Sequence, residues 1–459
     1  MNSLSSASIS KLAQDLQQVL TTRAYHAGIT SRFVQRRSPQ ARLDGASFVQ
    51  MLVFGFLNKP GASLHELCQS GAALGVRLSP QALDQRFTPA AVDLLECVLY
   101  AAVQVVVRAA PVQNEILNRF TAVWVCDSTT VALPAPWAER WPGCGGGHGG
   151  GESALKLHVR ADLKQGRWQG PLLTSGREQD QATPLAYHPL EAGSLHIADL
   201  GFFNLKQFLE WNKQNIFWLS RVRAGTQVWE EGRCFELSAL LGHWQRAAPD
   251  KVSQFEGAVE LGAARVPCRL WAWRLPPSLA AQQRGRLLAE AKRKGQAVSR
   301  ERLRLAGWTI LASNAPARLL SQAEALVLYR ARWQIERLFR LWKEVGEIDG
   351  GPGWRSQKAE RILCEVYAKL LGQIVEHWVI LSSGGWQDES RSLHQMAQTV
   401  QKHALIMASA LGRFGDLRRL EHALEVIGFC LTSGCQVNTR KKKPSLAQLL
   451  RDPFLSCFP

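Results

Sequence analysis

Two short apolar runs that each end in an aspartate constrain the fold of this chain more than any other feature. Residues 122–126 lead into Asp127, and residues 194–198 lead into Asp199. A hairpin-like stretch stands between them, and a helical stretch and a fifth strand follow, which predicts a mixed α/β layer. Because open sheets of this kind gather their chemistry at the carboxyl ends of strands, both aspartates are candidate functional residues.

A long helix predicted over residues 321–345 carries a third candidate acid. A rotation of roughly 100° per residue places Tyr329, Arg332, Glu336 and Lys343 within about 60° of one another, at the edge of a buried face. A carboxylate flanked by two cations and a phenol suits a site that holds a metal ion next to phosphates.

The pattern Tyr-x2-Arg-x3-Glu-x6-Lys, read from Tyr329 to Lys343, resembles the signature of the YREK group of insertion-sequence transposases, the fourth-named family of bacterial insertion elements. The family also has two aspartate motifs. Asp127-Ser128-Thr129-Thr130 resembles the first, and Asp199-Leu200-Gly201-Phe202 resembles the second. The resemblance covers roughly residues 118–380. It implies a DDE transposase with a ribonuclease-H-like core.

The resemblance also implies the residues that do the chemistry. The expected catalytic and metal-binding carboxylates are Asp127, Asp199 and Glu336. The expected DNA contacts are Tyr329, Arg332 and Lys343. Three converging carboxylates need cations to neutralise them, so two Mg²⁺ ions are expected, with Mn²⁺ as a substitute. The implied partners are transposon-end DNA, target DNA and a second copy of the chain in a synaptic homodimer; no membrane and no nucleotide cofactor are expected.

The predicted division has five parts. They are a helical N-terminal DNA-binding domain (1–112), the first part of the catalytic core (113–222), a β-rich insertion with a basic helix (223–318), the second part of the core with the glutamate helix (319–381) and a helical C-terminal region with a candidate dimerisation role (382–459).

A helix-turn-helix shape is predicted in the first domain, with a helix over 63–74, Ser79 as an N-cap and Pro80 at the first helical position. In that interpretation Gln81, Gln85 and Arg86 face a DNA groove. The alternative is an ordinary helical hairpin that packs on Ala82, Leu83 and Phe87.

The charge balance favours a polyanionic partner. The chain has 55 Lys and Arg against 38 Asp and Glu, a net charge of +17. The basic helical segment Arg284–Arg304 is predicted to contact phosphates, although a solvated face is the alternative. The run Arg440–Lys443 is interpreted as a solvated loop.

Other candidates are weaker. Some members of the resembled family stack a flipped base on a Trp in the insertion, and Trp271, Trp273 and Trp308 lie in that region, where a core role is an equal alternative. Lys156 and His158 either reach the site or form a sheet-edge pair.

Two further patterns are given structural interpretations. The Gly143–Gly151 run lacks the GxxxxGK[ST] pattern and is interpreted as a flexible loop. The ten cysteines form no CxxC pair, so reduced thiols are expected, and a metal site at Cys430 and Cys435 is disfavoured.

The sequence therefore predicts a transposase that binds the terminal inverted repeats of its element and carries out metal-dependent DNA cleavage and strand transfer. The alternatives are a non-catalytic DNA-binding protein derived from a transposase and a ribonuclease-H-like nuclease. No secretory signal or membrane span is visible, so a bacterial cytoplasmic, nucleoid-associated protein is expected.

Overall fold

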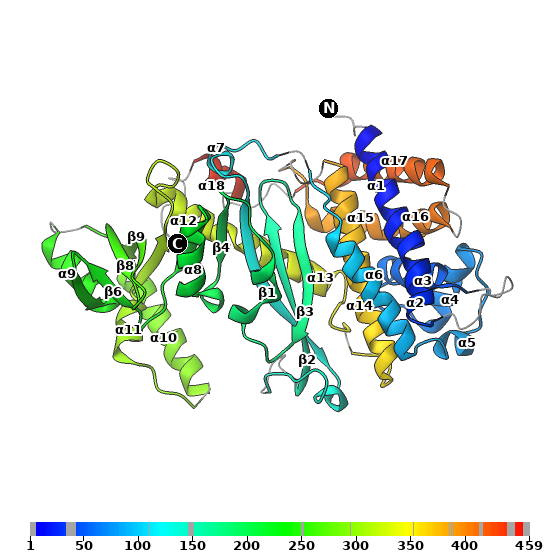
Figure 1. Ribbon diagram of the computed structural model, residues 1–459, viewed down its shortest axis with the longest axis horizontal. Coiled ribbons are helices and arrows are strands. Elements are labelled where there is room, and N and C mark those ends of the chain that lie inside the picture. Colours follow the sequence, from blue (N-terminus) through cyan, green and yellow to red (C-terminus); the bar gives the residue numbers. More distant parts are fainter. Residues whose placement is uncertain are drawn as a thin grey trace. The chain divides into compact units, whose positions relative to one another are not determined.

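The chain forms two compact units, each built from separate stretches of sequence (Figure 1). Unit 1 comprises residues 1–112, 128–178 and 335–442, and unit 2 comprises residues 113–127, 179–334 and 443–459. The structure, a computed structural model, describes residues 6–33, 43–109, 111–145, 151–248, 252–293, 295–351, 353–384, 386, 388, 390–412, 416–437 and 446–452.

Unit 1 is mainly helical, and its core is built around two apolar helices. In α3, every residue from Gly45 to Leu57 is buried, and α14 is buried almost continuously from Ile362 to Leu381. Helices that are apolar all round belong at the centre of a domain, and α14 packs against α3 and α6. The helices are α1 (Ser6–Gln17), α2 (Ala24–Thr30), α3 (Gly45–Asn58), α4 (Leu64–Ala73), α5 (Pro80–Asp84), α6 (Pro89–Gln104), α14 (Ala359–Ser382), α15 (Leu393–Lys402), α16 (Ala404–Leu411) and α17 (Leu417–Gly434).

The strands of unit 1 form the predicted hairpin. They are β2 (Ser153–Asp162) and β3 (Trp168–Ser175), which pair antiparallel. The strand β1 (Val123–Leu133) belongs to both units, because Asp127 is its last residue in unit 2 and Ser128 is its first in unit 1. The strand order on this side is β3-β2-β1.

Unit 2 holds most of the sheet. From β1 the strand order is β1-β4-β5-β10-β9-β8-β6-β7. Three strands run parallel, β1, β4 and β5, and the others pair antiparallel. The strands are β4 (Leu195–Ala198), β5 (Phe217–Arg221), β6 (Gln227–Glu230), β7 (Arg233–Glu236), β8 (Gln254–Leu261), β9 (Val266–Arg274) and β10 (Trp308–Ser313). This topology confirms the predicted mixed α/β class with a ribonuclease-H-like order of the first five strands.

The helices of unit 2 lie between and after these strands in the chain. They are α7 (Glu115–Asn118), α8 (Leu205–Lys213), α9 (Leu237–Ala247), α10 (Pro277–Arg293), α11 (Arg300–Leu305), α12 (Gln322–Ala331) and α18 (Leu446–Arg451). The core of the unit is aromatic at its centre, where the rings of Phe208 and Trp218 stack 4.2 Å apart.

Three element predictions need correction. The strand predicted to end at Asp127 continues to Leu133. The helix predicted over residues 321–345 is interrupted at Arg332, which separates α12 from α13 (Trp333–Glu344). The basic segment Arg284–Arg304 is not one helix, because α10 ends at Arg293 and α11 begins at Arg300.

The helix pair predicted in the N-terminal region is confirmed as secondary structure. Ser63 caps α4, and Ser79 caps α5 with Pro80 at its first turn. Gln81, Gln85 and Arg86 are exposed, whereas Leu83 and Phe87 are buried and Ala82 is half-buried. This burial pattern fits both a DNA-reading helix and a packed hairpin, so the choice between them stays a prediction.

Some predictions fall outside the described residues. Arg440–Lys443 is one of them, and so is the middle of the glycine run, residues 146–150. The nine cysteines that the structure describes are all free thiols. No helix in the described part of the chain combines the length and the apolar character that crossing a membrane requires.

Candidate active site

Asp127 and Asp199 lie side by side in unit 2 because their strands are neighbours. The strands β1 and β4 pair in parallel, with Cys126 opposite Ala198. Asp127 is the next residue of β1, and Asp199 is the first residue after β4. Neighbouring strands are roughly 4.8 Å apart, so the two carboxylates share one edge of the sheet. Two negative charges at this separation need a compensating partner.

The end of α12 supplies that compensation. The Arg332 guanidinium donates from Nη1 to Asp127 Oδ2 at 2.9 Å, with side chains that are only 11% and 17% exposed. The Tyr329 hydroxyl donates to Asp199 Oδ1 at 3.3 Å. Burial raises the pKa of Tyr329, and the charge of Asp199 raises it further, so the phenol remains a donor at neutral pH.

Arg221 completes this edge of the sheet, and sequence reasoning missed it. It is the last residue of β5, and β5 pairs in parallel with β4 so that Ile197 lies opposite Leu219. The same register brings Arg221 to the level of Asp199. Its place at the carboxyl end of a third parallel strand is the signal that could have found it.

Glu336 and Lys343 lie in unit 1, on α13. Glu336 is in the first turn of this helix and Lys343 in the last, which is the favourable arrangement for each charge in the helix dipole. The adjoining face of α13 carries buried Phe339 and Trp342, and the ring centroids of Trp342 and Trp168 are 5.3 Å apart.

The convergence of Glu336 with the two aspartates stays a prediction. Within each unit taken by itself, the described residues include no group of three or more His, Cys, Asp or Glu side chains that could hold a metal ion. The aspartate pair nevertheless suits a hard divalent cation, because carboxylate oxygens are the ligands that Mg²⁺ prefers.

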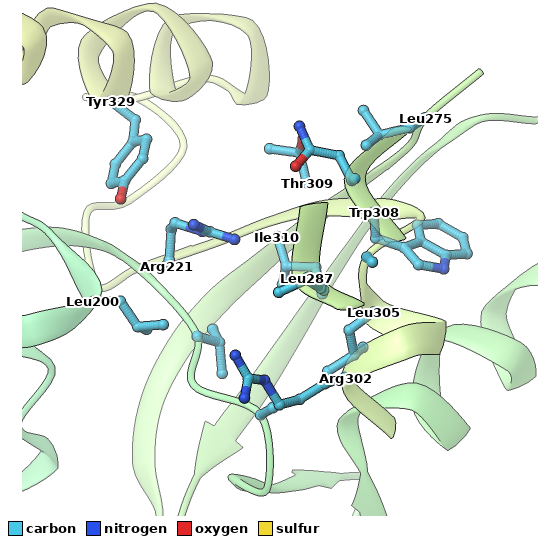
Figure 2. Close-up of a pocket in the computed structure, with 14 residues that line it drawn as sticks. Leu200, Arg221, Leu275, Leu287, Arg302, Leu305, Trp308, Thr309, Ile310 and Tyr329 are labelled. Carbon is cyan, nitrogen blue, oxygen red and sulfur yellow. The ribbon is translucent and has the colours of Figure 1, made fainter. Parts of the chain in front are cut away.

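A pocket of about 480 Å³ lies within unit 2, and its lining includes Leu200, the residue after Asp199 (Figure 2). Tyr329, Leu200 and Arg221 line one side, and Trp308 lies at the other. Arg302 of α11 adds a second cation to an otherwise mostly apolar lining. An apolar cavity with cations at its wall fits a flat ring attached to an anionic group.

The three insertion tryptophans differ in burial. Trp271 and Trp273 are 0% and 2% exposed and belong to the core of unit 2. Trp308 is half-buried and lines the pocket. Of the three, Trp308 alone has the access that a stacking role requires.

Lys156 and His158 pair with neighbours in unit 1. Lys156 Nζ donates to the Glu178 carbonyl, and His158 Nε2 lies 2.9 Å from Thr174 Oγ1 on the adjacent strand. Both side chains are buried, as the sheet-pair interpretation requires.

Sequence comparison identifies the family. The model of the transposase DDE domain matches residues 119–349, half of the 459-residue chain, and the chain belongs to this family. It is 24% identical over 359 residues to the transposase of insertion sequence element IS231B of Bacillus thuringiensis subsp. berliner, which covers 74% of this chain and 73% of that protein. It is 22% identical over 379 residues to the transposase of element IS1151 of Clostridium perfringens, covering 77% and 76%.

A structural comparison gives a weaker likeness. The synaptic complex of piggyBac transposase with hairpin DNA matches at a TM-score of 0.47 and 10% identity, over 97% of this chain and 88% of that one. A TM-score at this level does not establish a shared fold. The family match and the sequence relatives make this chain a DNA transposase of an insertion sequence, an enzyme that acts on DNA. Its assignment to the YREK group stays a prediction.

Proposed function

We propose that this transposase binds the terminal inverted repeats of its element, cuts the DNA at their boundary with the help of divalent metal ions, and joins the freed 3′ ends to target DNA. The observation that carries the proposal is that Asp127, inside β1, lies beside Asp199, which follows the parallel strand β4, within the region that matches the DDE domain. A DNA-binding protein without chemistry has no need of two half-buried, neighbouring carboxylates.

In this proposal Asp127, Asp199 and Glu336 hold the metal, Mg²⁺ or Mn²⁺. When bound, two such ions lower the pKa of the attacking water or 3′ hydroxyl and stabilise the leaving oxygen. The protein itself positions the carboxylates, and it shields Asp127 from water with Arg332, whose side chain is 11% exposed. Tyr329 does the same for Asp199 through its hydroxyl.

The three flanking residues are proposed to contact DNA. Arg332 neutralises Asp127 in the free chain, and its planar guanidinium also fits a phosphate. Lys343 is the cation in the last turn of α13, and Tyr329 lines the pocket. Trp308, at the far side of that pocket, is the proposed stacking surface for a base, because an aromatic face binds bases regardless of sequence.

We also propose a role for each of the predicted domains. Residues 1–112 are proposed to read the element ends, and residues 113–222 with 319–381 to form the catalytic core around the insertion 223–318. The region 382–459 is proposed to hold two copies together in the synaptic complex. Exposed apolar side chains support the last role, because Phe429 is 68% exposed and Ile406 is 49% exposed.

The test is cleavage of a supercoiled plasmid that carries both ends of the element, in Mg²⁺, Mn²⁺ or EDTA. We expect metal-dependent breaks at the element boundary, and loss of these breaks in Asp127→Asn, Asp199→Asn and Glu336→Gln, each with end binding retained. Glu210→Gln, an exposed acid on α8, is the matched control and should cleave like the wild type. Tight end binding without breaks in any metal would favour the non-catalytic binder, and breaks without end specificity would favour a nuclease.

A further inference from the structure

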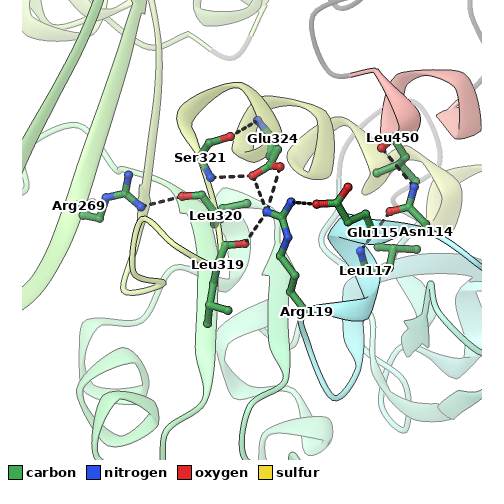
Figure 3. A network of polar contacts seen from close by, with 10 residues as sticks. All are labelled: Asn114, Glu115, Leu117, Arg119, Arg269, Leu319, Leu320, Ser321, Glu324 and Leu450. Atoms are coloured by element: carbon green, nitrogen blue, oxygen red, sulfur yellow. Dashed lines mark hydrogen bonds and ion pairs between the residues drawn. The ribbon is translucent and has the colours of Figure 1, made fainter.

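A charged pair ties the start of α12 to the segment that leads into β1. Arg119 Nη1 lies 3.0 Å from the Glu324 carboxylate, and the side chains are 25% and 13% exposed. The same nitrogen donates to the Leu319 carbonyl at 3.4 Å, in the turn before α12. Figure 3 shows the Arg119 guanidinium between this turn and Glu115. An arginine with several partners is held more firmly than one in a single exposed ion pair.

Glu324 has a second task that fixes where α12 begins. It forms a capping box with Ser321, whose backbone N–H donates to Glu324 Oε2 at 2.8 Å. The carboxylate therefore defines the first turn of the helix and receives Arg119 at the same time. Arg269 of β9 also binds the turn before α12, because its Nη1 donates to the Leu320 carbonyl at 2.7 Å.

The Arg119–Glu324 pair joins α12 to the segment before β1, and α12 and β1 are also joined at Asp127 by Arg332. From Ser321 to Tyr329, α12 rises about 12 Å. From Val123 to Asp127, β1 extends about 13 Å. The helix and the strand are thus connected near both ends, by the Arg119–Glu324 pair at the start and by the Arg332–Asp127 pair at the site.

We propose that Arg119 and Glu324 are positioning residues that set how far α12 lies along β1, and thereby bring Tyr329 and Arg332 to the two aspartates. Neither residue contacts the site itself. A slide of one helical residue would move Arg332 by about 1.5 Å, and misplacements of that size in an active site cost on the order of 100-fold in rate. The proposal rests on the proposed catalytic role of Asp127.

Four substitutions separate positioning from simple stability. Arg119→Ala removes the tie. Glu324→Gln removes its charge but keeps the capping box, since Gln also serves at that position. Glu115→Gln is the matched control, because Glu115 is an 88% exposed partner of the same arginine and belongs to α7. Arg119→Lys retains the charge and should restore part of the function.

The experiment measures, for the full-length chain, the single-turnover cleavage rate on plasmid ends, the affinity for end DNA and the unfolding temperature. We expect Arg119→Ala to cleave about 10- to 100-fold more slowly with end affinity within about twofold of wild type. Glu324→Gln should be slower by a smaller factor, and the double variant no slower than Arg119→Ala, because the two side chains act as one unit. Glu115→Gln should match the wild type.

Other results would overturn the proposal. Wild-type cleavage by Arg119→Ala would do so, as would a rate that falls only in proportion to end affinity or to the folded fraction. If the wild type itself does not cleave, the proposed function fails, and amide hydrogen exchange then tests the Arg119–Glu324 pair. Faster exchange across residues 322–328 in Arg119→Ala but not in Glu115→Gln supports the positioning role. Unchanged exchange in Arg119→Ala contradicts it.

Discussion

Asp127 and Asp199 are held in different ways. Asp127 lies inside β1, with paired strand on its N-terminal side and five further strand residues before Leu133. Asp199 follows the last residue of β4 and precedes a 3₁₀ turn over Leu200–Phe202. The first carboxylate is therefore fixed by the sheet itself. The position of the second depends on the turn that follows it.

That turn has a close neighbour at Gly201. A Cβ added to Gly201 would lie 2.7 Å from Asp180 Oδ2. A side chain at this third position of the Asp-x-Gly-aromatic motif therefore requires the Asp180 carboxylate or the turn to move.

Gly201→Ala should shift the turn and with it Asp199. We expect end cleavage to slow by about tenfold while end binding is retained, measured by the plasmid assay and by a binding titration. Gly242→Ala on α9 is the control, because a Cβ there meets nothing within 4 Å. That variant should cleave normally and be slightly more stable, since alanine favours a helix. Equal effects of both substitutions would contradict this explanation.

At the scale of elements, strong periodic patterns predicted most of the core, and the errors have local causes. The β2–β3 hairpin and the capped start of α4 were predictable because turn and capping residues mark them. The break at Arg332 has no such mark. Neither Gly nor Pro is present, and Arg332 N donates to Tyr329 O at 3.3 Å, a tightened turn that accompanies its ion pair with Asp127.

The hairpin of β6 and β7 was missed because its turn is unusual. Glu231 and Gly232 both have positive φ, 47° and 80°, as the two central residues of a type I′ turn require. Asn or Asp usually precedes the glycine in such a turn, so the Glu231-Gly232 pair does not match the sequence pattern that predicts a hairpin. The Arg119–Glu324 contact was out of reach for another reason, since it joins residues 205 positions apart without any shared motif.

The centre of α14 should give unit 1 a distinctive dependence on pH. Burial raises the pKa of Glu376 to about 8. Burial also lowers the pKa of His377 to about 3, although its Nε2 lies 2.6 Å from the Gly166 carbonyl. In the unfolded chain the two groups titrate near their ordinary values of 4.5 and 6.5. The folded state therefore retains a proton on Glu376 and excludes one from His377.

The signs of these two effects predict a plateau in the free energy of unfolding. His377 stabilises the fold above pH 6.5, and this contribution is lost as the pH falls towards 3. Glu376 contributes most below pH 4.5, and this contribution is lost as the pH rises towards 8. Between 4.5 and 6.5 the two slopes oppose each other, so stability should be level there.

Glu376→Gln should abolish the fall between about pH 6.5 and 8, a difference of a few kcal/mol. Denaturant titrations across this pH range measure it. Glu360→Gln, in the first turn of the same helix, should leave the profile unchanged. A variant that loses stability above pH 6.5 as steeply as the wild type would show that Glu376 is not the responsible group.

At the scale of the whole molecule, the excess positive charge is unevenly placed. The net charge is +17, and α10 with α11 presents exposed arginines that include Arg286, Arg300 and Arg304. These helices belong to the same unit as the pocket and the two aspartates. Such a surface should add affinity for DNA that does not depend on base sequence.

Salt dependence tests that role. Replacing Arg300 and Arg304 by Gln should lower the slope of log affinity against log salt by about 1 to 2, because each lost phosphate contact removes about 0.9. Binding titrations from low to moderate salt provide the slope. Lys206 and Lys213, exposed on α8, are the control pair with the same change of charge. A slope that changes equally in both double variants would mean that only net charge matters.

The short helix α18 has a consequence for the order in which the molecule is made. It packs against α12, and the Leu450 carbonyl accepts a hydrogen bond from Asn114, which is buried just before β1. Unit 2 thus needs residues near position 450, synthesised after most of unit 1 has been translated. On the ribosome, the packing of α12, the helix that carries Tyr329, cannot be completed until α18 has emerged from the exit tunnel.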